Sequence, residues 1–97
     1  IRWIEGMKEI RKSSQFKKDF KRIRNDNDKV EALLNIVRLL ERGEGIPDKY
    51  SPHMLKGRLK GIMECHIGPD YLLLWLDEEK NIVRLIRLGS HAEIFGM

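Results

Sequence analysis

The stretch from residue 59 to residue 88, LKGIMECHIGPDYLLLWLDEEKNIVRLIRL, decides the fold of this chain. Its three apolar runs have the near two-residue periodicity that is typical of strands. They cover residues 59–67, 71–76 and 82–88. The breaks between the runs are short and contain turn-forming residues, with Gly68-Pro69-Asp70 in the first and residues 77–81 in the second. Turns this short join antiparallel neighbours, so the stretch predicts an antiparallel meander.

Upstream of the meander, the spacing predicts a first helix. It follows a short strand at residues 7–12, and Ser13 or Ser14 can cap it. Its apolar residues have the i, i+4, i+7 spacing of one helix face, while lysines and arginines occupy the other faces. This apolar stripe consists of Phe16, Phe20 and Ile23.

A second and stronger helix is predicted after a polar break. Asp28 and Glu31 have capping-box spacing, the helix runs to about Arg42, and Gly43 stands where a C-terminal cap is expected. Its apolar face consists of Val30, Leu33, Leu34, Val37 and Leu40. Because the link between the two helices is short, we expect them to pair as an antiparallel hairpin.

These elements predict an α+β fold with the order β-α-α-β-β-β, in which a helical hairpin packs on one face of a small antiparallel sheet. A short C-terminal helix or turn should follow, through Phe95. The chain has 97 residues, too few for a barrel enzyme or two full domains, so we expect one domain over residues 7–97. Residues 1–6 precede Met7, and we expect them to be a cloning remnant or an upstream extension.

The charge of the chain is unevenly distributed. The total is +4, but residues 1–24 carry nine basic and three acidic side chains, a net +6. Residues 61–97 carry three basic and six acidic side chains, a net −3. A basic N-terminal surface suggests an anionic partner, such as nucleic acid or an acidic protein. The alternative is that the basic helix face is merely solvated.

The single cysteine, Cys65, excludes an intrachain disulfide and favours a reducing, cytoplasmic compartment. Because Cys65 alternates with His66, we expect it to point to the opposite face as a buried apolar residue rather than to act as a nucleophile. The longest apolar run, residues 71–76, is too short for a membrane span, so no membrane partner is expected.

Titratable residues stand at the predicted element boundaries. Asp70 follows His66 by four residues, and Arg87 precedes His91 by four. His53 lies at the end of the loop before the meander, and two cations follow it, Lys56 and Lys60. Because strand ends of a meander meet at one rim of the sheet, we expect these residues to form one cluster.

Metal-free cleavage of RNA requires such a set of groups. A base removes the proton of the ribose 2′-hydroxyl, an acid protonates the departing 5′-oxygen, and a cation stabilises the charge on the phosphorane. Imidazole titrates near neutrality, and the guanidinium fork of arginine matches phosphate oxygens. Val83 and Leu85 alternate with Arg87, so we expect Arg87 on a partly buried face, placed for an anion.

Plainer interpretations stay open for these residues. His66 could be an ordinary strand histidine, His53 an exposed loop residue, and Tyr71 and Phe95 members of the core. A zinc site built from the histidines and Asp70 is the metal alternative. No His-x-x-x-His or Cys-x-x-Cys spacing supports it, so no metal ligand is predicted.

Four motifs stand in order along the chain: SQFKKD at 14–19, HMLKG at 53–57, ECHIGPD at 64–70, and RLGSH at 87–91 with Phe95 beyond it. Together they resemble the YafQ branch of the RelE superfamily of bacterial toxins, over about residues 7–96. The resemblance implies a RelE-like fold and an endoribonuclease that cuts mRNA, typically on the translating ribosome, without a metal or other cofactor. It also implies a cognate antitoxin, which we expect to be small and to cover the site with an acidic segment.

The resemblance further implies residue roles. The residues that match the acid–base group of the family are His53, His66, Asp70 and His91. Arg87 matches the phosphate-binding residue, and Phe95 completes the site near the nucleotide. We expect additional RNA contacts from Lys17, Lys18, Lys56, Lys60 and Tyr71. The alternative function is a non-catalytic basic binding module or a gyrase-inhibiting relative of the same fold. Such relatives lack the histidine group, so the histidines favour cleavage.

Overall fold

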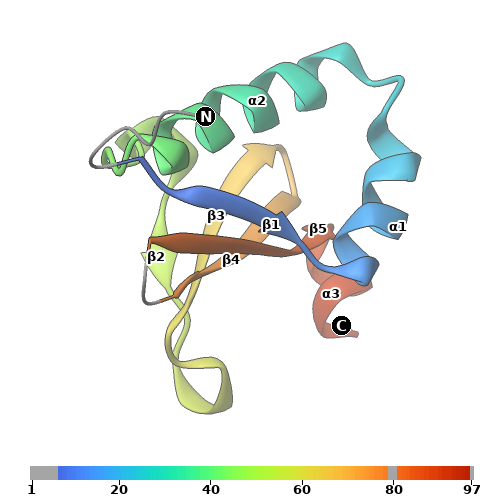
Figure 1. Cartoon of the computed structure of the whole chain (residues 1–97). Coiled ribbons are helices and arrows are strands. Elements are labelled where there is room, and N and C mark those ends of the chain that lie inside the picture. The colour runs from blue at the N-terminus through green and yellow to red at the C-terminus, as the bar shows by residue number, and fades with distance from the viewer. Residues whose placement is uncertain (1–6, 79–80, 97) are drawn as a thin grey trace.

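The computed structural model describes residues 7–78 and 81–96 (Figure 1). Its helices are α1 (Ser14–Ile23), α2 (Asn27–Glu41) and α3 (His91–Phe95). Its strands are β1 (Glu9–Lys12), β2 (His53–Met54), β3 (Ile62–Gly68), β4 (Tyr71–Glu78) and β5 (Ile82–Gly89). The predicted α+β class and the predicted elements are confirmed, with β2 as an additional strand. The expectation for residues 1–6 lies outside the described residues.

All five strands belong to one sheet in the order β1-β5-β4-β3-β2. The predicted meander is confirmed, because β4 pairs antiparallel with both β3 and β5. The expectation of a wholly antiparallel sheet is wrong at one edge, where β1 runs parallel to β5. Tight turns fix the direction of consecutive strands, whereas a long helical connection follows β1 and allows either direction.

The short strand β2 and the start of β3 also differ from the prediction. β2 pairs antiparallel with β3 and places His53 opposite Glu64, where the sequence suggested the end of a loop. Two residues are too few to show a periodicity. β3 begins at Ile62, later than predicted, because Gly57 and Gly61 adopt positive φ angles around a 3₁₀ turn.

Polar side chains and a glycine determine where the two long helices begin and end. Ser13 caps α1 as predicted. The cap of α2 is Asp26, whose carboxylate accepts a hydrogen bond from the Lys29 backbone N–H at 3.2 Å, so the predicted capping box at Asp28 is wrong. Asp28 lies in the exposed first turn of α2, where its charge complements the helix dipole. Gly43, with φ of 68°, follows the end of α2 as predicted.

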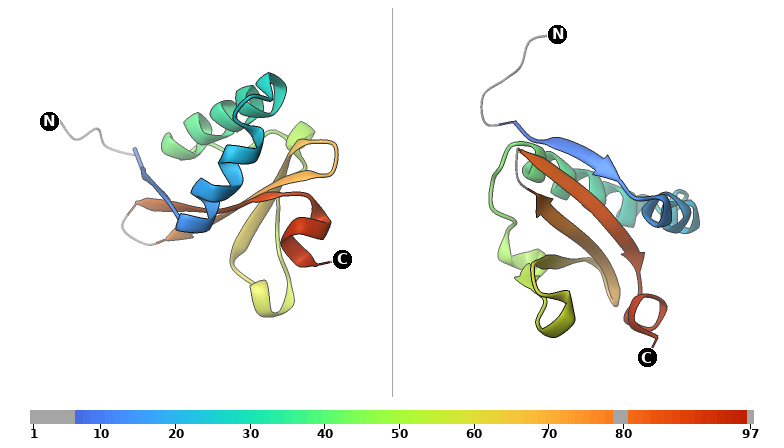
Figure 2. Two further views of the ribbon diagram at one scale, coloured as in Figure 1. Left: turned by 90° about the vertical axis from the view of Figure 1, so that its right-hand side faces the viewer. Right: turned by 60° about the horizontal axis from the view of Figure 1, so that its bottom comes forward.

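Helices α1 and α2 cover the same face of the sheet and enclose the hydrophobic core with it (Figure 2). In α2, Leu33 and Leu40 are buried as predicted, but Ile36 faces the core and Leu34 is exposed. α1 packs mainly on β5, whereas α2 packs on β3 and β1, so the helical hairpin is open rather than closely paired. None of the helices in the described part of the chain is long and apolar enough to cross a membrane.

A β-bulge in β5 sets the direction of Arg87. Leu85 and Arg87 pair with consecutive residues of β4, which leaves Ile86 as the extra residue. Leu85 belongs to the core under the helices, so the bulge turns Arg87 to the opposite face. The expectation that Arg87 shares a face with Val83 and Leu85 is therefore wrong. Its side chain is nevertheless partly buried as expected, with 26% exposed.

Candidate active site

The sheet face opposite α1 and α2 carries most of the predicted catalytic residues. Glu64 of β3 and Arg87 of β5 flank the buried Leu74 of β4. His66 lies two residues after Glu64 on β3 and therefore shares this face. Helix α3 and the loop of residues 55–61 lie on this side of the sheet, away from α1 and α2 (Figures 1 and 2).

Asp70 and His91 form a hydrogen-bonded pair at the rim of this face. Asp70 Oδ1 lies 2.6 Å from His91 Nδ1 and accepts a second hydrogen bond, 3.3 Å long, from the His91 backbone N–H. The side-chain hydrogen bond to His91 is the main cause that lowers the pKa of Asp70, so the carboxylate is ionised at neutral pH. Nδ1 then carries a hydrogen toward Asp70. Nε2 has no partner within residues 7–78 and 81–96 and is available for proton exchange with a ligand.

Three local features hold α3, and with it His91, at this rim. Ser90 and Glu93 form a capping box, with hydrogen bonds of 3.1 and 2.8 Å between side chain and backbone. Glu93 Oε2 also pairs with Arg22 Nη1 of α1 at 2.8 Å. Gly89 allows α3 to lie close to β5, because a Cβ atom there would be 3.3 Å from the Cβ of Glu93.

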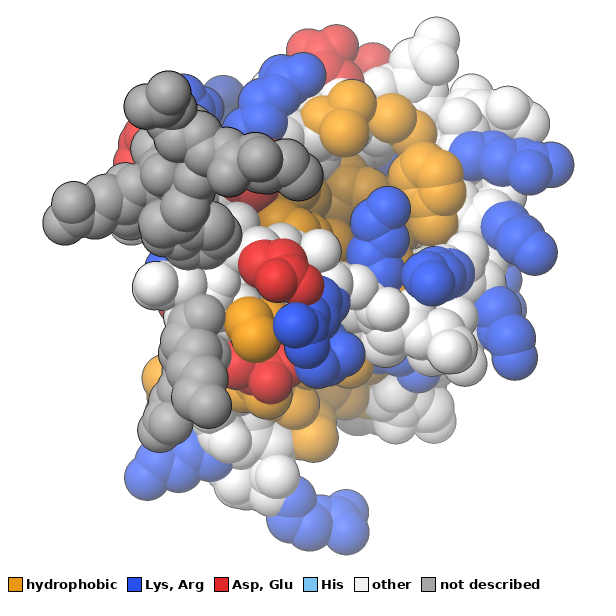
Figure 3. Space-filling view, in the orientation of Figure 1, with side chains coloured by type: hydrophobic (Ala, Val, Ile, Leu, Met, Phe, Trp, Pro, Cys, Tyr) orange, Lys and Arg blue, Asp and Glu red, His pale blue; other side chains and the backbone are white. Residues whose placement is uncertain are grey.

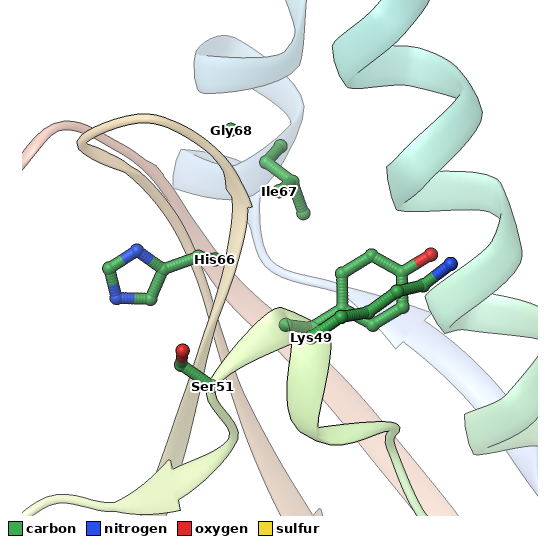
Figure 4. Close-up of a pocket in the computed structure, with 6 residues that line it drawn as sticks. Lys49, Ser51, His66, Ile67 and Gly68 are labelled. Carbon is green, nitrogen blue, oxygen red and sulfur yellow. The ribbon is translucent and has the colours of Figure 1, made fainter.

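His66 extends the Asp70–His91 pair into an aromatic row. Its ring centroid lies 6.1 Å from that of His91, and the His91 centroid lies 6.2 Å from that of Phe95. Figure 4 shows the His66 imidazole on one side of its strand and Ile67 on the other, toward the helices. An open hollow of about 420 Å³ adjoins His66, and its other lining residues are Lys49, Tyr50, Ser51, Ile67 and Gly68. The hollow leaves the imidazole accessible to a ligand.

His53 forms a second histidine–carboxylate pair with Glu64. His53 Nε2 lies 3.1 Å from Glu64 Oε1, and its Nδ1 lies 3.1 Å from the Ser51 carbonyl oxygen. Both neighbours are hydrogen-bond acceptors, so the ring satisfies both when each nitrogen carries a hydrogen. Glu64 is only 3% exposed and was not among the predicted site residues. Its position two residues before His66 is the sequence signal that places it on the same face.

Arg87 is held by another carboxylate that the sequence analysis missed. Asp19 of α1 is fully buried, and its Oδ2 accepts hydrogen bonds from Arg87 Nε at 2.8 Å and from the Leu88 backbone N–H at 3.0 Å. Gln15 donates to Oδ1 at 2.9 Å. Burial raises the pKa of Asp19, but the hydrogen bonds from Arg87, Leu88 and Gln15 outweigh it and leave the pKa below its ordinary value. Asp19 follows Phe16 by three residues, a spacing that could have placed it on the buried stripe of α1.

The predicted RNA-binding lysines lie on two exposed surfaces. Lys17 and Lys18 are exposed on α1, and Lys56 and Lys60 are exposed on the loop of residues 55–61. Arg58 lies on the same loop, is equally exposed, and was not predicted. The alternation of cations at 56, 58 and 60 was the available signal.

Tyr71 and Cys65 lie on the side of the sheet that faces the helices. The ring of Tyr71 packs against the core, with the Lys29 ammonium 5.1 Å from its centroid, so the structure does not bring it into the histidine group. Cys65 is fully buried, as expected. Burial raises the pKa of its thiol to about 12, which makes it a poor nucleophile.

An apolar groove lies between α1, α2 and β1, on the face away from the histidines. Its volume is about 400 Å³. Its apolar lining consists of Ile10, Phe16, Phe20, Leu33, Leu34, Val37 and Leu85, and its cationic lining of Lys12, Lys17, Lys21 and Arg24. Figure 3 shows hydrophobic side chains gathered on this face with basic side chains beside them.

Histidine, cysteine, aspartate and glutamate side chains are the usual metal ligands in proteins. Within the residues that the structure describes, no three of them are placed to hold a metal ion together. The Asp70–His91 and Glu64–His53 pairs each supply two candidate ligands, one fewer than such a group of three.

Comparison with known proteins shows which family the chain resembles. A family model described as a bacterial toxin of type II toxin-antitoxin system, YafQ, matches residues 8–96. The chain is 32% identical over 92 residues to the mRNA interferase toxin YafQ of Escherichia coli (strain K12). The matched region covers 92% of this chain and 97% of the relative.

The chain is also similar in sequence and fold to solved structures. A metal-bound toxin from Helicobacter pylori is 38% identical, with a TM-score of 0.82 and coverage of 92% of this chain and 100% of that one. A chain of the DinJ-YafQ toxin-antitoxin complex from E. coli is 30% identical, with a TM-score of 0.80 and coverage of 93% and 99%.

Proposed function

This chain belongs to the YafQ family of type II toxin–antitoxin toxins, and from this premise we propose that it is an mRNA endoribonuclease that works by acid–base catalysis without a metal. The observation that carries the proposal is the Asp70–His91 pair, whose imidazole ring lies 6.1 Å from that of His66, centroid to centroid, at the sheet face that also carries Arg87. Cleavage would stop translation and growth by destroying the message.

The proton transfers belong to the histidines. A neutral His91 that donates from Nδ1 to Asp70 carries its lone pair on Nε2, as a general base requires. A charged His91 donates from Nε2, as a general acid requires, and the same carboxylate stabilises that charge. His66 and His53 are the candidates for the complementary transfer, because they lie along the same face.

Arg87 serves as the phosphate group's counter-charge. Its Nε is bound to Asp19, and neither Nη atom has a partner among the described residues. Two nitrogens are thus available for the oxygens of the scissile phosphate, whose negative charge grows in the phosphorane. Phe95, next to His91, offers an aromatic surface for a neighbouring base.

The exposed cations supply contacts to the RNA backbone. Lys56, Arg58 and Lys60 lie on the loop beside the histidine face, and Lys17 and Lys18 lie on α1. Such contacts position a nucleic acid without reading its sequence. On the ribosome they would bind ribosomal RNA as well as the message, and the enzyme would act in the cytoplasm, where mRNA is translated.

A cognate antitoxin is the expected protein partner, as in the DinJ-YafQ complex. The apolar groove with its four cations fits an amphipathic helix with acidic flanks, by hydrophobic burial and by charge complementarity. A further acidic segment of the same antitoxin would cover the histidine face and exclude RNA from it.

Expression in bacteria with mapping of mRNA 5′ ends tests this function. Wild-type protein should arrest growth and produce discrete new ends within messages, while His91→Ala and Arg87→Ala should produce neither. Growth arrest without new ends would favour the alternative, a non-catalytic binding module or a gyrase-inhibiting relative. Loss of cleavage by the purified protein in a chelator would contradict the metal-free mechanism.

A further inference from the structure

Helix α1 completes the edge of β5 where β1 ends. β1 pairs with β5 only as far as Lys12 opposite Leu85. Beyond that point Ser13 takes over, with its backbone N–H donating to the Leu85 carbonyl at 2.9 Å and its hydroxyl donating to the Ile86 carbonyl at 2.7 Å. Asp19 then accepts the Leu88 N–H at 3.0 Å. On this edge, the bulged segment around Arg87 is therefore held by Ser13, the cap of α1, and by Asp19 rather than by a strand.

The same Asp19 oxygen that accepts from Leu88 also accepts from Arg87 Nε at 2.8 Å. Asp19 is completely buried, whereas Arg87 is 26% exposed. A guanidinium is planar, so fixing its Nε–H direction also fixes the direction of its two Nη groups. Asp19 thus anchors the guanidinium through Nε and leaves both Nη groups without a partner among the described residues.

We propose that Asp19 is a positioning residue of the active site, which holds the Arg87 fork in the orientation that binds the scissile RNA phosphate. This inference rests on the proposed function, because it gives Asp19 a role in phosphate binding. Catalysis is sensitive to placement, since a displacement of about 1 Å can reduce a rate by about 10²-fold. A long arginine side chain has several rotatable bonds, and a buried ionised partner restricts them more than solvent would.

The alternative is that Asp19 serves only the fold, by satisfying the Leu88 N–H and the end of β5. Asp19→Asn separates the two roles. Asparagine has nearly the same volume and retains an oxygen that can accept from Leu88, but it has no charge with which to fix the guanidinium. Asp28→Asn is the matched control, because it removes the same charge from the exposed first turn of α2.

The test is a double-mutant cycle on RNA cleavage by the full chain, with Asp19→Asn, Arg87→Ala and the double variant, and with kcat and KM measured separately. We expect Asp19→Asn to lower kcat by about 10- to 10²-fold with little change in KM. In the Arg87→Ala background Asp19→Asn should cause no further loss, because the group that it positions is gone. Asp28→Asn should cleave like the wild type.

An additive loss in the double variant, or wild-type kcat in Asp19→Asn while Arg87→Ala is inactive, would overturn the positioning role. Failure of the proposed function is a separate outcome, because the wild-type protein itself would then leave RNA uncut.

If Asp19→Asn does not fold, the wild-type protein still gives an answer by NMR. The Arg87 Nε–H should exchange with water at least about 10-fold more slowly than that of an exposed arginine such as Arg58. Equal exchange rates would contradict the anchor.

Discussion

Asp19 and Asp70 each hold one functional group of the proposed site, Arg87 and His91, and the surroundings of the two carboxylates differ. Asp19 is completely buried and binds a guanidinium, which stays charged at any physiological pH. Asp70 is exposed and binds His91, whose imidazole is the proton carrier of the proposed mechanism. In the proposed mechanism the two pairs have different roles: the buried pair fixes a permanent charge in space, and the exposed pair moves protons.

Removing His91 or Arg87, the groups that the two carboxylates hold, should have the largest effect on RNA cleavage. We expect His91→Ala and Arg87→Ala each to lower the RNA cleavage rate by about 10²-fold or more, since one removes a proton carrier and the other the counter-charge of the phosphorane. Single-turnover cleavage measures the loss, and thermal unfolding should show an intact fold. Arg38→Ala, at an exposed position on α2, is the control that should retain wild-type activity. Full activity in both site variants would refute the site assignment.

Asp70→Asn removes the negative charge of the exposed pair while it preserves the shape of the turn. We expect a loss of about 10-fold in kcat, because a carboxylate that orients an imidazole and stabilises its charged form is typically worth about 10- to 100-fold. The pH–rate profile should also shift, because the anion beside His91 has gone. An unchanged rate and an unchanged profile would mean that the charge of Asp70 has no part in proton transfer.

A third region, the lysines of α1, belongs to neither pair and should affect binding rather than chemistry. Replacing Lys17, Lys18 and Lys21 with glutamine should weaken RNA binding several-fold and flatten its dependence on salt concentration, by about one unit of slope for each phosphate that the variant no longer neutralises. kcat at saturating RNA should remain that of the wild type. Arg22 is left in place, because it pairs with Glu93 and supports α3. An unchanged salt dependence would mean that this helix face is only solvated.

The smallest predicted effect distinguishes the two carboxylates by their contribution to stability in acid. The pKa values of Asp19 and Asp70 both lie below the ordinary value, so each group stabilises the fold above the unfolded pKa of about 3.9. This contribution is lost as the pH falls through the lower pKa of the folded state. Asp19 accepts hydrogen bonds from Arg87, Leu88 and Gln15, whereas Asp70 accepts from His91 alone among the described residues, so Asp19→Asn should remove more of the acid-side pH dependence of unfolding than Asp70→Asn. Urea unfolding between about pH 3 and pH 7 measures this, and an equal effect of the two variants would contradict the contrast in hydrogen bonding.

Local signals in the sequence predicted the parts of the fold that are fixed by neighbours in the chain. The three strands of the meander follow from apolar runs and short turns, and α1 follows from Ser13 and its apolar stripe. The parallel pairing of β1 could not be predicted, because it depends on a long connection. The two-residue strand at His53 and the bulge at Ile86 leave no periodicity to detect.

The candidate site could likewise be predicted only in part. The histidines, Asp70 and Arg87 could be identified by their chemistry and by motif resemblance. The carboxylates Glu64 and Asp19 were missed, because each becomes notable only when burial and a distant partner are known. Asp19 lies 68 residues before Arg87, and no local pattern predicts that pairing.

The most direct test of the central claim is cleavage of a short RNA by the purified protein in the presence of a chelator, compared with the same RNA carrying a single 2′-deoxy nucleotide at the cut site. Acid–base catalysis through the ribose hydroxyl predicts that the RNA is cut to a 2′,3′-cyclic phosphate end, and that the 2′-deoxy substrate stays intact. Cleavage of the 2′-deoxy substrate, or cleavage that requires an added metal ion, would contradict the account.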